Sequence, residues 1–177
     1  MVKKEGTAFM FDGERILHYN QKQMKEKIVK KSLNDGGIVM ELQKITLMDA
    51  YLIETLRNKG ISNQEILTKI EQGNVEEWKD LHKHFDFNEL LTFADQDRKV
   101  LESVLEDGYQ VKYVTFQGMQ NLIKYRFGKV KDKDYQLTET GITNLQLNED
   151  QVNTLKQMLS ANWIFNQDGE FVSLFHR

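Results

Sequence analysis

The chain has 177 residues, of which 40% are hydrophobic and 29% charged, and its formal net charge is −3. A chain of this length can bury enough apolar surface to fold without staples. The absence of cysteine excludes disulfides, thiolate chemistry and cysteine-based zinc sites. No apolar run approaches the roughly 18 residues that a membrane span needs, and residues 1–6 lack the apolar core of a secretory signal. We therefore expect a cytoplasmic protein.

The first predicted elements are a hairpin, a helix and a strand. Asp12-Gly13 separates two apolar-aromatic runs, which predicts a β-hairpin over residues 7–19 because type I′ turns need positive φ angles. A capping-box pattern then opens a lysine-rich helix over about 21–33. The apolar residues at 38–42 predict the next strand.

Three short helices are predicted next. Thr46, Ser62 and Asn74 are each followed three residues later by an acidic residue, the pattern of a capping box that starts a helix. Glycines separate these helices. We predict that they form a helical lobe at 46–85 within a single domain that spans 1–177.

A long helix and a strand–helix stretch follow. Apolar periodicity predicts a helix over 87–107, a strand over 109–114 and a helix over 115–127 that ends at Gly128. Carboxylates are plentiful, and almost all of them fall on predicted exposed helix faces. The outer face of the long helix is acidic, with Asp95, Asp97, Glu102 and Glu106.

The C-terminal part ends in a second hairpin. A capping box at Asn148 opens another helix, and the runs at 162–166 and 170–176 flank the turn signal Asp168-Gly169. A hairpin alone is marginal in water, so each must pair or pack on helices. We predict an α+β fold with helices packed on a small, mostly antiparallel sheet and with N- and C-terminal β-hairpins.

Charge is unevenly distributed along the chain. Counting basic against acidic residues gives +4 for 1–34, −7 for 65–107, +5 for 109–133 and −4 for 134–177. One explanation is that solvated faces simply differ in sign. The other is that a basic surface docks an anionic partner while the acidic helices face water or a basic protein.

A candidate binding surface lies on the predicted helix 115–127 and the connector after it. One helix face carries polar residues at i, i+3, i+4 and i+7, and basic residues follow. Asparagine and glutamine can pair with adenine, and lysines neutralise phosphates. Asp132 and Asp134 interrupt the lysines, as is typical of an exposed hairpin loop. The candidate residues for nucleic-acid or anionic-partner binding are Gln117, Gln120, Asn121, Lys124, Lys129, Lys131 and Lys133.

The segment after this connector carries a resemblance to a known family. Residues 135–141 read Tyr-Gln-Leu-Thr-Glu-Thr-Gly, and this resembles the wing strand of winged-helix transcription regulators. The resemblance implies that the helix at 115–127 would be a recognition helix and that DNA or RNA would be the partner. Such a fold places two helices before the wing, whereas only one is predicted between the strand at 109–114 and the connector.

Metal and catalytic motifs are sparse. His82, His84 and Asp86 are weak candidates for metal ligands, since positions i and i+2 of a helix do not face each other. We expect no metal. The nucleophile elbow, Ser-x-x-Lys, Walker A and dinucleotide-binding patterns are all absent from the sequence, so we expect no cofactor.

Three functional hypotheses follow. The first is a non-enzymatic cytosolic regulatory or adaptor protein that binds another macromolecule, with a protein as the expected partner and no membrane. The alternative is a winged-helix-like DNA- or RNA-binding regulator that uses helix 115–127 and the basic connector. The third is an enzyme with no recognisable short motif. The oligomeric state, including a homo-oligomer, is left open.

Overall fold

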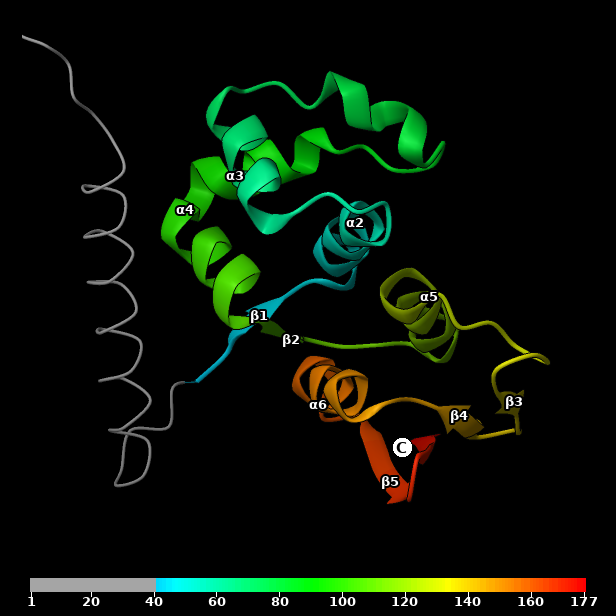
Figure 1. Cartoon of the computed structure of the whole chain (residues 1–177). Coiled ribbons are helices and arrows are strands. Elements are labelled where there is room, and N and C mark those ends of the chain that lie inside the picture. Colours follow the sequence, from blue (N-terminus) through cyan, green and yellow to red (C-terminus); the bar gives the residue numbers. More distant parts are fainter. Residues whose placement is uncertain (1–40) are drawn as a thin grey trace, which may run out of the picture. The chain divides into compact units, whose positions relative to one another are not determined.

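The computed structural model describes residues 41–177. The predicted N-terminal hairpin, the helix at 21–33 and most of the strand at 38–42 lie outside the described residues. Residues 41 and 42 are not in a strand, and the first described strand begins at Gln43. Leu42–Arg177 forms one compact unit, drawn in colour in Figure 1. The prediction of one domain over the whole chain, with a helical lobe at 46–85, stays a prediction.

Helices and a small sheet make up this unit, which confirms the α+β class. In chain order the elements are β1 (Gln43–Ile45), α2 (Leu47–Asn58), α3 (Asn63–Glu71), the 3-10 helix η1 (Glu76–Leu81), α4 (Asn88–Asp107), β2 (Tyr109–Val111), α5 (Phe116–Phe127), β3 (Gln136–Leu137), β4 (Gly141–Gln146), α6 (Glu149–Met158), β5 (Trp163–Asp168) and β6 (Phe171–His176).

Local capping signals set most helix boundaries. Thr46, Ser62 and Asn148 form complete capping boxes at the starts of α2, α3 and α6. In each, the side-chain oxygen accepts from the backbone N–H three residues on, and the side chain there accepts from the capping residue's own N–H. Thr115 caps α5, and Gly128 ends it in the left-handed region at φ 67°. The predicted capping boxes at Thr46, Ser62 and Asn148 and the predicted helix end at Gly128 are confirmed.

Two helical predictions need correction. Asn74 does not open an α-helix: its side chain accepts from the backbone N–H of Glu76, two residues on, and the chain continues as the 3-10 helix η1. The predicted continuous helix at 87–107 is interrupted at Asp97, whose φ and ψ are −158° and 91°. The Asp97 carboxylate accepts from the N–H of Val100 and so caps the second half of α4.

The strand predicted at 109–114 is shorter than expected. Only Tyr109–Val111 form β2, and they pair in parallel with β1. Beyond them, Val114 is held by the segment between α6 and β5 and by the first residue of β5. Its N–H donates to Ser160, and its carbonyl accepts from the side chains of Asn162 and Trp163. These bonds take the backbone groups that a longer strand would need.

The main sheet is antiparallel, with the order β3-β4-β6-β5. The terminal hairpin of β5 and β6 is confirmed. The strand expected at 135–141 is reduced to the two residues of β3, and β4 was not predicted. Gly141 allows β4 to approach β6, because a Cβ there would lie 2.4 Å from the backbone oxygen of Leu174.

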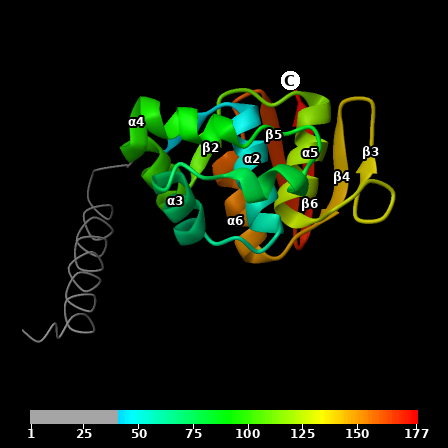
Figure 2. The same ribbon diagram turned by 90° about the horizontal axis from the view of Figure 1, so that it is seen from above.

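The helices are arranged around the two β regions. α2 packs against α5, α3 against α4, and α6 against β2. Figures 1 and 2 show α3 and α4 at one end of the unit and β3 with β4 at the other. One hydrophobic core runs through the unit and includes Leu52 of α2, Leu101 of α4, Met119 of α5 and Leu174 of β6. This arrangement brings α2, α4, α5 and the loops between them together.

Candidate binding surface and buried charge cluster

The predicted polar face of α5 is present, but much of it is engaged within the helix. Gln117 is exposed, and its Nε2 donates to Oδ1 of Asn121. Gln120 is half-buried, and its Nε2 lies 3.4 Å from the carbonyl oxygen of Phe116. Lys124 is exposed. The amides are therefore partly occupied, and Lys124 is the accessible charge on this face.

The connector after α5 is largely self-neutralised. Lys129 Nζ lies 3.6 Å from a carboxylate oxygen of Asp134, and Lys131 Nζ lies 3.7 Å from one of Asp132. A backbone N–H of the same loop donates to Asp134, and with the nearby lysines it holds the pKa of this carboxyl below its usual range. Lys133 is exposed. The connector thus forms a compact loop of alternating charge.

Lys124 instead joins a different group of basic residues. Lys59 is the C-cap of α2, Lys83 follows η1, and Lys124 belongs to α5. All three act electrostatically on His82, as does His84, and together with burial they lower the pKa of His82. We refer to Lys59, Lys83, His84 and Lys124, grouped around His82, as the basic patch.

The basic patch carries uncompensated positive charge. The charged groups that shift the pKa of His82 are all basic. None of Lys59, Lys83 and Lys124 forms an ion pair with a carboxylate of residues 41–177. Burial is the largest cause of the lowered pKa of His82, and the basic neighbours are the next largest. Both favour the neutral form of the imidazole. The patch therefore presents three exposed ammonium groups next to a neutral imidazole.

Aromatic rings pack against His82, the residue at the centre of the patch. The His82 ring stacks on Phe85 with 3.8 Å between centroids, and the Tyr125 ring meets it edge-on at 5.7 Å. Tyr51 stacks on Phe85 and donates its hydroxyl to the backbone oxygen of Gly118. His82 Nδ1 is buried and has no hydrogen-bond partner among the described residues. These contacts hold the His82 ring against Tyr125 of α5 directly and against Tyr51 of α2 by way of Phe85.

The weak metal candidates do not converge. The rings of His82 and His84 are 5.9 Å apart between centroids. A carboxylate oxygen of Asp86 accepts from the backbone N–H and the side-chain amide of Asn88. Within residues 41–177, no group of three or more histidine, aspartate or glutamate side chains could hold a metal ion.

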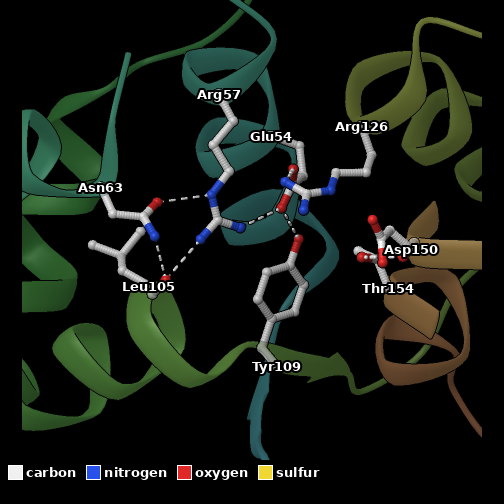
Figure 3. Close-up of polar contacts among 8 residues, drawn as sticks. All are labelled: Glu54, Arg57, Asn63, Leu105, Tyr109, Arg126, Asp150 and Thr154. Atoms are coloured by element: carbon white, nitrogen blue, oxygen red, sulfur yellow. Dashed lines mark hydrogen bonds and ion pairs between the residues drawn. The ribbon is translucent and has the colours of Figure 1, made fainter. Parts of the chain in front are cut away.

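A second site lies on another side of α5, around the buried carboxylate of Glu54. Glu54 is on α2 and is fully buried. Its Oε1 accepts from Arg57 at 2.8 Å and from the hydroxyl of Tyr109 at 2.7 Å, and its Oε2 accepts from Arg126 at 2.9 Å. Figure 3 shows these groups converging from α2, β2 and α5. We call these four residues the Glu54 cluster.

The Glu54 cluster is tied to two further helices. Arg57 Nε donates to Oδ1 of Asn63 in α3, and its Nη2 donates to the carbonyl oxygen of Leu105 in α4 (Figure 3). Asn63 Nδ2 donates to the same carbonyl. Burial, followed by the adjacent Glu54 carboxylate, raises the pKa of Tyr109 well above its usual value. At neutral pH the Tyr109 hydroxyl therefore keeps its proton and donates it to Glu54.

Beside the Glu54 cluster is a cavity of about 510 Å³. It opens between α2, the start of α3, the end of α4, β2, α5 and α6. The residues that line it are Glu54, Arg57, Gly60, Ile61, Ser62, Asn63, Leu105, Glu106, Asp107, Gly108, Tyr109, Arg126, Thr154, Gln157 and Met158.

Sequence reasoning missed both groupings in part. Helical periodicity identified Lys124 on α5, but Lys59 and Lys83 come from other elements and no spacing rule links them. The expectation that carboxylates lie on exposed helix faces fails at Glu54. A signal was available in the sequence: residues 50–53 and 56 around Glu54 are apolar. A carboxylate in such a helix needs a partner, such as the arginine three residues on.

The comparisons with known proteins give no assignment: no family model, curated protein or solved structure matches this chain. In the part of the chain that the structure describes, no helix is long and apolar enough to cross a membrane. The resemblance of residues 135–141 to a winged-helix wing strand therefore depends on the sequence of these seven residues alone. β3 and β4 pair around the intervening loop, and α4, β2 and α5 precede them.

Proposed function

We propose that this protein is a non-enzymatic regulator or adaptor that binds an acidic surface of another protein through the basic patch. The observation that carries the proposal is the grouping of Lys59, Lys83 and Lys124 around His82, at the junction of α2, α5 and the end of η1, which pack together. None of the three lysines forms an ion pair with a carboxylate of residues 41–177. Like charges placed together repel, so such a group favours an anionic partner.

Charge favours an acidic protein over a long nucleic acid. The chain has a net charge of −3, and the outer face of α4 exposes Asp95, Asp97 and Glu106. Tight nucleic-acid binding usually uses several phosphate contacts, whereas the patch offers three lysines. A compact acidic surface matches the patch better.

Neutralising the patch tests this proposal. In a variant with Lys59→Gln, Lys83→Gln and Lys124→Gln, we expect affinity for a labelled poly-glutamate peptide to fall about tenfold, because exposed ion pairs contribute roughly 0.2–1 kcal/mol each. Fluorescence anisotropy at low salt measures the change. We expect the wild-type affinity to weaken as salt is raised.

The connector supplies a matched control with the same change of net charge. In the variant Lys129→Gln, Lys131→Gln and Lys133→Gln, we expect little loss of affinity, because two of these lysines already lie near Asp132 and Asp134. Equal losses in the two triple variants would show that only net charge matters and would contradict the proposal.

A second candidate function is DNA or RNA binding through α5 and its connector. It is favoured by Lys124, which belongs to both surfaces, and by the exposed Gln117, which lies about two helical turns earlier on the same face of α5. Here the connector lysines would contact phosphates. Titration of duplex DNA at about 50 and 200 mM salt would then show a salt dependence that drops by roughly 0.9 in log–log slope for each phosphate-binding lysine removed. No binding at either salt removes this candidate.

The lowered pKa of His82 predicts a pH dependence of stability. As pH falls below about 6.5, the unfolded chain takes up a proton at this position before the folded protein does. We expect the free energy of unfolding to decrease in that window, and His82→Phe to reduce this dependence. Urea unfolding at several pH values measures it. His84→Phe removes one of the charges that lower the pKa of His82 and leaves its burial, so it should reduce the dependence by less than His82→Phe does.

A further inference from the structure

Arg126 has donors that the Glu54 cluster does not use. A guanidinium carries five N–H donors. Arg126 Nη1 binds Glu54, and no other hydrogen bond of its side chain is made to residues 41–177. The side chain is 28% exposed and lines the cavity of about 510 Å³. Arg126 therefore reaches the cavity with donors that no residue of 41–177 takes.

The charge balance of the cluster points in the same direction. Two guanidinium groups share the single carboxylate of Glu54, which leaves one positive charge in excess. Each of the three nitrogens of the Arg57 guanidinium already donates a hydrogen bond, to Glu54, Asn63 or Leu105. The excess thus resides on Arg126. A partly buried guanidinium with free donors binds carboxylate or phosphate oxygens well, because its fork geometry matches theirs.

We propose that this cavity binds a small polar molecule through an oxyanion group, carboxylate or phosphate, held by Arg126. The volume lies in the range of small-molecule sites, about 300–1,000 Å³. The hydroxyl of Thr154 donates to the backbone oxygen of Asp150 (Figure 3), so its lone pairs are left for a ligand donor. Gln157 adds a carboxamide to the lining.

The rim of the cavity restricts the size of the anion. Glu106 and Asp107 are exposed at the end of α4 and line the same cavity. They would repel an extended polyanion, but a small molecule can place its anionic group at Arg126 and hydrogen-bond donors toward the rim. This site is separate from the basic patch, because Arg126 and Lys124 lie two positions apart on α5 and so point to different sides.

A larger hollow of about 760 Å³ lies beside the start of α6, and its cations are engaged. Lys129 lies 3.6 Å from Asp134. Lys156 binds Oε1 of Gln167 and sits over the Phe165 ring. The contrast with Arg126 identifies the cavity of the Glu54 cluster as the better anion site.

Arginine modification of the wild-type protein tests the proposal without any substitution. Phenylglyoxal reacts with accessible guanidinium groups, and peptide mass spectrometry gives the rate at each arginine. We expect inorganic phosphate or malonate to slow modification of Arg126 in a saturable way. Arg98, which is exposed and bound to Glu71 and Glu102, serves as the internal control and should react at an unchanged rate.

Phosphate and malonate distinguish the two possible anionic groups of the ligand. The anion that slows modification of Arg126 at the lower concentration carries the group that the cavity prefers. Sodium chloride at matched ionic strength controls for screening. Protection of Arg126 by chloride to the same degree, equal protection of Arg98, or no protection by either anion would each overturn the proposal. None of these outcomes bears on the basic patch, which contains no arginine.

Discussion

Glu54→Ala is expected to destabilise the protein by about 3–5 kcal/mol, the cost of breaking a buried ion pair from one side. The substitution leaves two guanidinium groups without their carboxylate and the buried hydroxyl of Tyr109 without its acceptor. The three partners come from α2, β2 and α5, so the packing of these elements loosens together. Urea unfolding followed by circular dichroism measures the loss.

An exposed ion pair provides the control for this prediction. Glu102→Ala removes a carboxylate that binds Arg98 on the surface of α4. Exposed pairs contribute little to stability, so we expect the unfolding midpoint to stay close to that of the wild type. If Glu54→Ala lowered the free energy of unfolding no more than Glu102→Ala does, the Glu54 cluster would not stabilise the fold.

Trp163→Ala is expected to cost about 3–5 kcal/mol, as is usual when a buried tryptophan is truncated. Trp163 is 5% exposed at the start of β5. Its ring stacks on Phe116 with 6.1 Å between centroids, and its Nε1 donates to the carbonyl of Val114 at 2.8 Å. The change removes a large apolar contact and leaves a buried carbonyl with one partner fewer.

Far-ultraviolet circular dichroism is the suitable measurement, because the substitution itself alters fluorescence. Phe171→Ala is the matched control in the same hairpin, since Phe171 is 47% exposed at the start of β6. We expect this control to change stability by less than about 0.5 kcal/mol. A similar cost at both positions would contradict the packing described for Trp163.

The sequence predicted those parts of the fold that depend on neighbours in the chain. The capping residues Thr46, Ser62 and Asn148 were recognised because a cap is a contact over three residues. Gly128 was recognised because a helix end favours a left-handed residue. At Asn74 the same pattern failed, since the side chain closed a shorter turn instead.

Contacts between distant segments could not be predicted in this way. The parallel pairing of β1 with β2 joins residues more than sixty positions apart. Each strand has only three residues, too few to show the alternation of apolar and polar residues that would predict it. The Glu54 cluster depends on Arg126, 72 positions away. The basic patch likewise combines Lys59, Lys83 and Lys124, which come together only in the folded chain.

The most direct test of the proposed basic patch is to locate where an acidic ligand contacts the wild-type protein. Titration of the ¹⁵N-labelled chain with a poly-glutamate peptide, followed by amide chemical shifts, gives this location. We predict saturable shifts at Lys59, Lys83 and Lys124, that disappear at high salt. Shifts confined to the connector around Lys131, or no shifts at low salt, would contradict binding through the basic patch.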